Sequence, residues 1–227
     1  TVNGTTYKSK EVSDAIHAGN VAYNESAKYN NKAYVTDVNE LTQSEMDEII
    51  KYAYTKGMGV IPLINTPGHM DAILAAATSL TKENCAFSSA GKTSVRTIDV
   101  TPDSTAVKFT KAFLTKYITY FASKGCKYFN MGADEYANDA FSSGSMGFGK
   151  LQELDKYGNF VTYVNDVSTM IKATKVNVGN VDEIIYMTPI AFNDGIYFAN
   201  DKSSGKIDTD IIIEYWSNGW SGYSPRT

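Results

Sequence analysis

The sequence predicts an α/β fold in which strands and helices alternate around a parallel sheet. Three observations carry this prediction. Continuous apolar runs of strand length recur four times along the 227 residues, which is typical of parallel strands covered on both faces. Segments with helical hydrophobic periodicity separate the runs. Polar and aromatic residues gather directly after each run, and the carboxyl ends of parallel strands are where such folds bind their ligands.

The composition excludes several classes of function. Hydrophobic residues make up 43% of the chain, charged residues 20%, and the net charge is −4. Lys and Arg form no cluster, so we expect no nucleic-acid partner. No apolar run approaches the roughly 18 residues of a membrane span. The two cysteines, Cys85 and Cys126, establish no disulfide framework, and either two thiols or one bridge fits the sequence.

The N-terminal part changes character near residue 41. Residues 1–40 are rich in Asn, Thr, Lys and Tyr and predict a loop-rich excursion with one short helix over 9–19. A capping box of Thr42 and Glu45 then predicts the start of a helix with apolar residues on one face. Gly57 is expected to end that helix.

The first strand and the segment after it follow this helix. The apolar run over 58–65 predicts a strand that is buried on both faces. A Thr-Pro-Gly-His turn leads from it into an Ala-rich helix over 70–80. Residues 81–100 predict a polar loop with a short extended piece over 95–100.

The middle of the chain predicts a second strand between two helical regions. Thr101–Pro102 is expected to cap a long helix that ends at Gly125. The strand over 127–131 comes next. Residues 145–175 predict one or two helices, with a break near Tyr157–Gly158.

Two further apolar runs, over 184–192 and 211–216, predict the third and fourth strands. No Gly-rich phosphate-binding loop follows any strand, which disfavours a nucleotide cofactor and favours a barrel. A complete (β/α)8 TIM barrel needs eight strands and about 250 residues. We therefore expect residues 1–227 to form one partial catalytic (β/α) barrel domain, about the middle half of a barrel with four βα units. Its open edges are expected to be covered by the remainder of the same barrel or by another chain.

A pair of adjacent acids, Asp134 and Glu135, directly follows the second strand. Two like charges a few ångströms apart raise the pKa of one carboxyl, which keeps one acid protonated beside an ionised one. This is the minimal equipment for cleaving a glycosidic bond. The alternative is that the two acids only begin a helix, where the helix dipole favours negative charge.

Polar or aromatic residues also follow the other three strands. These residues are His69, Asp71, Asn193, Asp194, Trp216 and Trp220. Asn-Asp-Gly is also ordinary turn chemistry, and a Trp can equally well fill a core. Asn138 and Asp139 would suit the first turn of the next helix. Metal sites in barrels usually show several His at strand ends, so we predict no metal here.

Four segments resemble glycoside hydrolase family 20, and they occur in the order found in that family. They are residues 60–71 (VIPLINTPGHMD), 129–139 (FNMGADEYAND), 191–195 (AFNDG) and 215–220 (YWSNGW). The resemblance covers nearly the whole chain, is weakest over 1–40 and is nearest to the streptococcal cell-surface branch. The usual family pattern His-x-Gly-Gly-Asp-Glu is changed here at Asn130 and Ala133, and the streptococcal branch departs similarly.

The resemblance implies a retaining exo-β-N-acetylhexosaminidase, extracellular or attached to the cell wall. Its substrates would be glycans with a terminal β-linked N-acetylglucosamine or N-acetylgalactosamine. In the substrate-assisted mechanism of the family, the 2-acetamido oxygen attacks the anomeric carbon. By resemblance, Glu135 is the general acid and base, Asp134 orients the acetamido group, and His69 holds Glu135. Trp216 and Trp220 would wall the sugar subsite.

Three more residues are candidates for bonds to sugar hydroxyls, namely Asn193, Asp194 and Asn138. The complete family site also uses an Arg, a Tyr and a further acid that this sequence does not match, so we expect the chain alone to be inactive. A different class of function also fits, a non-catalytic carbohydrate-binding or assembly module derived from such an enzyme. A metal-dependent barrel hydrolase is a third alternative.

Overall fold

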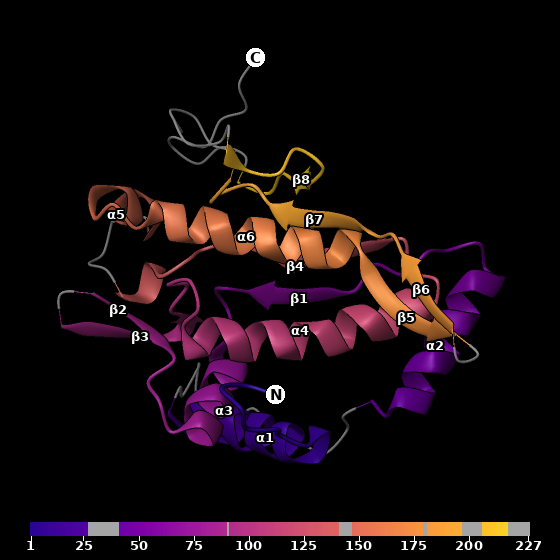
Figure 1. The fold of residues 1–227 in the computed structure, drawn as a ribbon, viewed down its shortest axis with the longest axis horizontal. Helices are drawn as coiled ribbons and strands as arrows, with labels where there is room; N and C mark the ends of the chain where they lie inside the picture. Colours follow the sequence, from indigo (N-terminus) through magenta and orange to yellow (C-terminus); the bar gives the residue numbers. More distant parts are fainter. Residues whose placement is uncertain (27–40, 90, 141–146, 179–180, 197–205, 218–227) are drawn as a thin grey trace.

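A parallel four-stranded sheet forms the centre of the computed structural model, which describes residues 1–26, 41–89, 91–140, 147–178, 181–196 and 206–217. The strands lie side by side in chain order (Figure 1). They are β1 (Leu63–Thr66), β4 (Tyr128–Gly132), β7 (Thr188–Phe192) and β8 (Ile212–Glu214). Each neighbouring pair is parallel. The predicted α/β fold with a parallel sheet is therefore confirmed.

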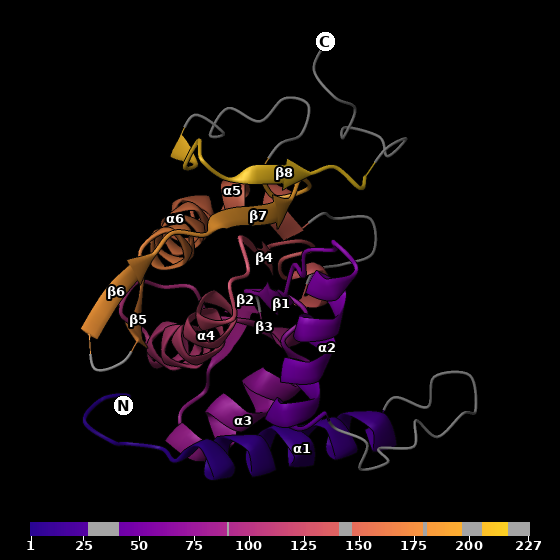
Figure 2. The same cartoon turned by 90° about the vertical axis from the view of Figure 1, so that its right-hand side faces the viewer.

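Two long helices, α4 (Thr105–Ser123) and α6 (Tyr157–Lys172), lie on the same side of this sheet (Figure 2). The apolar stripe of each helix is buried, as the helical periodicity predicts. The predicted break before α6 is confirmed, because the short helix α5 (Gly147–Glu153) ends four residues earlier. No helix among the described residues is both long and apolar enough to cross a membrane.

The start of α4 differs from the prediction. Its N-cap is Ser104, whose hydroxyl accepts a hydrogen bond from the Val107 N–H (3.2 Å). Thr101 instead bonds the Asp99 carboxylate through both its N–H (3.0 Å) and its hydroxyl (2.8 Å). The Thr101–Pro102 pair therefore belongs to a turn before the helix, because a local side-chain acceptor competes for its donors.

The N-terminal helix α1 (Ser9–Ser26) is longer than the predicted 9–19. It packs along α3 (Asp71–Thr81) (Figure 1). At Gly19 the approach is so close that a Cβ would lie 2.9 Å from the Cβ of Ala75. The remaining residues of the predicted excursion, 27–40, lie outside the described residues.

The capping box predicted at the next helix, α2 (Gln43–Thr55), is confirmed. The Thr42 hydroxyl accepts from the Glu45 N–H (3.2 Å), and the Glu45 carboxylate accepts from the Thr42 N–H (2.7 Å). Two donors that the first turn of a helix leaves unpaired are thereby satisfied.

The first apolar run does not form a strand buried on both faces. The strand β1 covers only Leu63–Thr66, and it pairs with β4 alone among the described strands. Met58 (54%), Ile61 (52%) and Leu63 (47%) are exposed. An apolar run marks a segment that can be covered, but its coverage depends on neighbours that the run itself does not supply.

Two hairpins were not predicted. One is formed by β2 (Ala86–Ser89) and β3 (Lys92–Ile98), in the segment predicted as a loop. The other is formed by β5 (Thr174–Val178) and β6 (Val181–Ile185). The first two residues of the apolar run over 184–192 belong to β6 of the second hairpin. Only Thr188–Phe192 of this run form a strand of the parallel sheet. Short β-branched runs suit antiparallel and parallel strands equally, and periodicity cannot separate the two.

Both cysteines are buried free thiols, which decides between the two alternatives of the sequence. Burial raises the pKa of each thiol. One part of the core is an aromatic cluster around Tyr136, whose ring meets Phe87, Phe148 and Phe160 at centroid distances of 5.4 to 6.3 Å. Tyr136 directly follows the acid pair, so this cluster anchors the loop that carries the two acids.

Candidate active site

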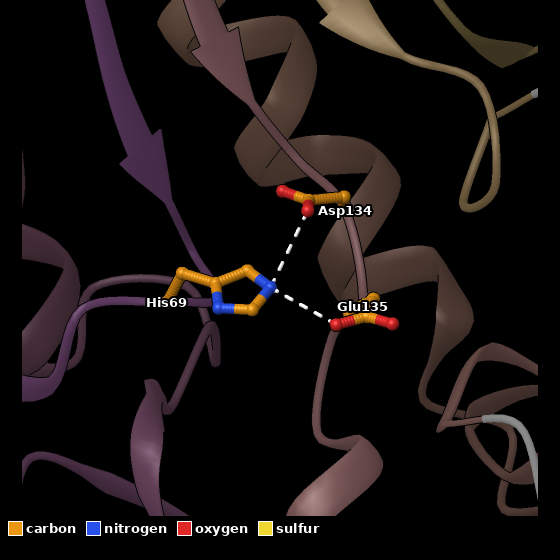
Figure 3. Close-up of side chains that lie close together, drawn as sticks. All are labelled: His69, Asp134 and Glu135. Atoms are coloured by element: carbon orange, nitrogen blue, oxygen red, sulfur yellow. Dashed lines mark hydrogen bonds and ion pairs between the residues drawn. The ribbon is translucent and has the colours of Figure 1, made fainter. Parts of the chain in front are cut away.

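Three predicted catalytic side chains meet at the carboxyl ends of β1 and β4 (Figure 3). His69 lies in the loop after β1, and Asp134 and Glu135 follow β4. The imidazole Nε2 lies 3.1 Å from Glu135 Oε2 and 3.3 Å from Asp134 Oδ2, and it points between the two carboxylates. Residues 66 positions apart in the chain thus form one cluster.

The backbone of this cluster adopts a conformation that L-residues rarely take. His69 (φ 51°), Ala133 (φ 66°), Glu135 (φ 47°) and Ala137 (φ 57°) all lie in the left-handed region. Each such residue costs about 1 kcal/mol or more, and such conformations persist where the surroundings hold them, often at functional sites. The alternative that the two acids begin a helix is therefore wrong. The next helical turn is the short 3₁₀ helix η2 (Asn138–Ala140).

Two glycines allow the β1 and β4 loops to approach each other. A Cβ at Gly68 would lie 2.7 Å from the carbonyl oxygen of Asp134, and a Cβ at Gly132 would lie 2.2 Å from Oδ1 of Asn65. Any side chain at Gly68 would push apart the backbones that carry His69 and the acid pair. The Thr-Pro-Gly-His turn therefore has a steric requirement for its glycine.

The acid pair changes the proton affinity of His69. Its pKa is raised above the ordinary value, chiefly by the hydrogen bond with Asp134 and also by the charges of Asp134 and Glu135. Partial burial and the Arg96 guanidinium act in the opposite direction. His69 therefore carries its positive charge at a higher pH than a free histidine, and this charge offsets part of the negative charge of the two acids.

The two acids differ in exposure. The Asp134 side chain is 12% exposed, while the Glu135 side chain is 32% exposed. Oδ1 of Asp134 is buried and has no hydrogen-bond partner among the described residues. A carboxylate oxygen in that state is costly unless a ligand donates to it.

Asn193 and Asp194 follow β7, and both side chains are fully buried. Oδ1 of Asn193 accepts from the Trp216 N–H (3.0 Å), and its amide donates to the Ser217 hydroxyl (2.6 Å). Oδ2 of Asp194 accepts from the backbone N–H of Glu135 (2.9 Å), and its Oδ1 accepts from the Trp216 indole N–H (3.0 Å). The structure thus places both residues among protein donors and acceptors rather than on a sugar-facing surface.

Burial raises the pKa of Asp194 to about 6. The N–H groups of Glu135 and Trp216 limit the rise, while the charge of Asp134 adds to it. A group with this pKa changes charge just below neutral pH, so its two accepted hydrogen bonds depend on pH in that range.

The other predicted binding residues are distributed differently. Trp216 is 39% exposed as a residue, and its ring packs edge-on against Phe192 with 6.2 Å between the ring centroids. Asn138 lies in η2, where its side chain is half-buried and its N–H donates to the Glu135 carbonyl oxygen (3.4 Å). Trp220 lies outside the described residues.

Asp139 and Asp71 have structural partners. The Asp139 carboxylate accepts from the Ser94 hydroxyl (2.7 Å) and from the Val95 N–H (2.8 Å), which ties the β2–β3 hairpin to the acid-pair loop. Asp71 lies 3.8 Å from Arg96 Nε, and this pair is close enough to His69 for the guanidinium to affect its pKa.

One link near the site was missed by the sequence analysis. The Asn130 amide, which stands where the usual family pattern has His, donates to Glu214 Oε2 on β8 (2.7 Å). Its carbonyl oxygen accepts from the Gly132 N–H (2.8 Å). The available signal was Glu214 itself, a single acid within an apolar run of strand length.

The three clustered residues also form a minimal donor set for a cation. One ligand atom from each of His69, Asp134 and Glu135 lies within 4.8 Å of the others. A metal ligand must be deprotonated, and the raised pKa of His69 moves this deprotonation to higher pH. The arrangement is better suited to holding a proton between His69 and two carboxylates.

Comparison with known proteins assigns this arrangement to a family. Residues 7–221 match the family described as glycosyl hydrolase family 20, catalytic domain. The chain belongs to this family. The predicted family and the predicted enzyme class, a glycoside hydrolase, are therefore confirmed.

Solved structures and curated proteins give similar results. A structure of the pneumococcal virulence factor StrH matches all of this chain with a TM-score of 0.80 and 38% identity, and the match covers 48% of that chain. A second StrH structure, described as that of tandem catalytic modules of an exo-β-D-N-acetylglucosaminidase, matches at 38% identity with a TM-score of 0.79 and 49% coverage. Lacto-N-biosidase from Bifidobacterium bifidum is 29% identical over 185 residues, which are 77% of this chain and 14% of that protein. The chain thus spans about half the length of the StrH structures.

Proposed function

We propose that this family 20 domain acts as a retaining exo-β-N-acetylhexosaminidase on glycans with a terminal β-linked N-acetylglucosamine or N-acetylgalactosamine. The observation that carries the proposal is the cluster of His69, Asp134 and Glu135, held within 3.3 Å at the carboxyl ends of two neighbouring strands. The likeness to StrH, described as an exo-β-D-N-acetylglucosaminidase, supports the same chemistry.

The reaction proceeds in two steps in this proposal. In the first, Glu135 gives its proton to the glycosidic oxygen while the substrate's acetamido oxygen attacks the anomeric carbon. The bond to the leaving group breaks, and a cyclic oxazolinium ion forms. In the second, the Glu135 carboxylate takes a proton from water, and the water oxygen opens the ring at the anomeric carbon with retained configuration. The 32% exposure of the Glu135 side chain leaves room for this contact with substrate.

Asp134 is the partner of the acetamido N–H in this mechanism. Its unpartnered Oδ1 supports the assignment, because a substrate N–H would satisfy a buried acceptor that the described protein leaves open. Positive charge develops on the acetamido nitrogen as the oxazolinium ion forms. A carboxylate already held beside this nitrogen stabilises the transition state more than the ground state.

His69 and Trp216 support the two reacting groups. The imidazole Nε2 lies against both carboxylates, so it holds their orientation. Trp216 exposes part of its ring at the end of β8, where an apolar face can pack against the C–H face of a sugar.

The test is hydrolysis of N-acetyl-β-glucosaminides by the protein that carries this chain. In Glu135→Gln, a substrate with a poor leaving group should lose about 10²- to 10⁴-fold in kcat, because its departure needs a proton. An activated aryl substrate should lose less. Equal losses on both substrates would argue against Glu135 as the acid.

We also propose that the 227 residues alone are inactive and that the enzyme works outside the cell or attached to its wall. The chain spans about half of the StrH structures, and the family's sugar-gripping Arg and Tyr have no match in it. The isolated chain should show less than 1% of the activity of a protein that carries all eight βα units. Full turnover by the isolated chain would contradict this.

A further inference from the structure

We propose that Asp194 is a positioning residue that fixes the catalytic acid Glu135 and the sugar-facing Trp216 relative to each other. This inference rests on the function proposed above. Asp194 lies at the end of β7, and β7 lies between β4 and β8 in the sheet. Glu135 and Trp216 follow those two neighbouring strands.

The two oxygens of Asp194 have different partners. Oδ2 accepts from the backbone N–H of Glu135 (2.9 Å), 59 positions away in the chain. Oδ1 accepts from the indole N–H of Trp216 (3.0 Å), 22 positions away. A single rigid side chain therefore sets the distance between the acid and the aromatic wall.

Glu135 needs such support because of its backbone. Its φ of 47° is a conformation that an L-residue does not hold without help. A hydrogen bond from its N–H to a buried carboxylate stabilises this conformation, and the conformation determines where the Glu135 side chain points. Loss of the bond would leave Glu135 free to relax away from the glycosidic oxygen.

Trp216 is held by Asp194 and by its neighbour Asn193. Its backbone N–H donates to the Asn193 side chain, and its indole N–H donates to Asp194. The orientation of the ring is thus tied to β7 at two points, although the residue itself follows β8. A wall that must face one side of a sugar ring gains from this restraint.

The chemistry of the position requires a carboxylate. Both partners are N–H donors, and a carboxylate offers an acceptor to each. An asparagine of the same size would turn its NH₂ group toward one of the two donors and lose that bond. The full burial of Asp194 excludes the alternative of direct contact with sugar hydroxyls in this conformation.

The experiment compares Asp194→Asn with the unchanged protein that carries this chain. We expect kcat to fall at least 10-fold on a substrate with a poor leaving group and clearly less on an activated aryl substrate, because a displaced acid matters most where protonation limits the rate. The matched control is Asp208→Asn, which removes a carboxylate that pairs with Lys172 (2.5 Å) and accepts from Ser168 (2.7 Å). The control should leave both rates within about 2-fold.

A second measurement does not depend on turnover. The indole ¹H–¹⁵N resonance of Trp216, assigned with Trp216→Phe, should move upfield in Asp194→Asn because the carboxylate acceptor is lost. If Asp194→Asn does not fold, the amide resonance of Glu135 in Trp216→Phe tests the same link from the other side and should shift.

The outcomes separate the two proposals. An unchanged protein that does not hydrolyse either substrate would overturn the proposed function, while the resonances still test the link. Normal activity in the unchanged protein, together with rates and an indole resonance that Asp194→Asn leaves unchanged, would overturn the role of Asp194. Equal loss of kcat on both substrates would also overturn it, because general destabilisation does not distinguish leaving groups. An unchanged Glu135 amide resonance in Trp216→Phe would have the same meaning.

Discussion

The ends of β4 and β7 carry similar sequences but serve different purposes. Asp134 and Glu135 follow β4, and Asn193 and Asp194 follow the neighbouring strand β7. Both pairs were predicted to face the substrate. After β4, Glu135 is partly exposed, and one oxygen of Asp134 has no hydrogen-bond partner within the described part of the chain. After β7, both side chains are fully buried and bond other parts of the protein. Polar residues at one edge of a sheet thus divide into those that stay partly exposed and those that bond other parts of the protein.

The largest expected effect is a loss of activity on substitution of Asp134, at the end of β4. Asp134→Asn should lower kcat about 10²- to 10³-fold on N-acetyl-β-glucosaminides, because a preorganised carboxylate opposite the developing positive charge is lost. The measurement is steady-state kinetics on one chromogenic substrate. The free energy of unfolding should change little by comparison, and an unchanged kcat would remove Asp134 from the mechanism.

The next effect concerns His69, which lies opposite the acid pair. His69→Gln should lower kcat about 10- to 100-fold, since the side chain can still donate to one carboxylate but carries no charge. The raised pKa of His69 means that its charge stabilises the fold fully below its unfolded pKa of about 6.5 and that this contribution is lost as pH rises through the folded pKa. Urea unfolding of both proteins from pH 5.5 to 9 should show the stability difference shrinking with pH. A constant difference would contradict the ion pairing.

A third prediction tests the supporting role of the β7 end through stability. Asn193→Ala should lower the free energy of unfolding by about 1–3 kcal/mol, because the Trp216 N–H loses a buried acceptor. The comparison is Asn138→Ala. The Asn138 side chain is half-buried, so its removal should lower the free energy of unfolding by less. A larger loss for Asn138 than for Asn193 would reverse the assignment of the two asparagines.

The titration of Asp194 gives a smaller, pH-dependent effect. Its folded pKa of about 6 lies above the ordinary aspartate value of 3.8, so the unfolded chain ionises first as pH rises. Asp194 therefore destabilises the fold increasingly between about pH 4 and 6, and the penalty is constant above that range. The stability of the unchanged protein minus that of Asp194→Asn should fall over this window. The other titratable groups are the same in both proteins and cancel to first order, so a flat difference would contradict the raised pKa of Asp194.

The smallest expected effect is that of a chelator. EDTA should leave the rate unchanged, because the proposed mechanism needs no cation. The measurement is activity before and after dialysis against EDTA at neutral pH. Loss of activity that Zn²⁺ or Mn²⁺ restores would favour the metal-dependent alternative.

Local patterns were sufficient for much of the fold and for the heart of the site. The four apolar runs, the capping box of Thr42 and Glu45, and the break before α6 all depend on residues close together in the chain. The position of the acid pair directly after a strand also follows from local order. The rule that carboxyl ends of parallel strands meet at one edge was enough to bring His69 near the two acids.

By itself, the sequence determined where the four parallel strands lie and which polar residues follow them, because propensity and periodicity act over a few neighbouring residues. Only the tertiary structure decided which of these residues stay exposed and which are buried. The full burial of Asp194 depends on partners 59 and 22 positions away, and the exposure of Leu63 depends on which strands cover β1. The two hairpins were decided in the same way, since a short β-branched run pairs with whichever strand the fold brings beside it.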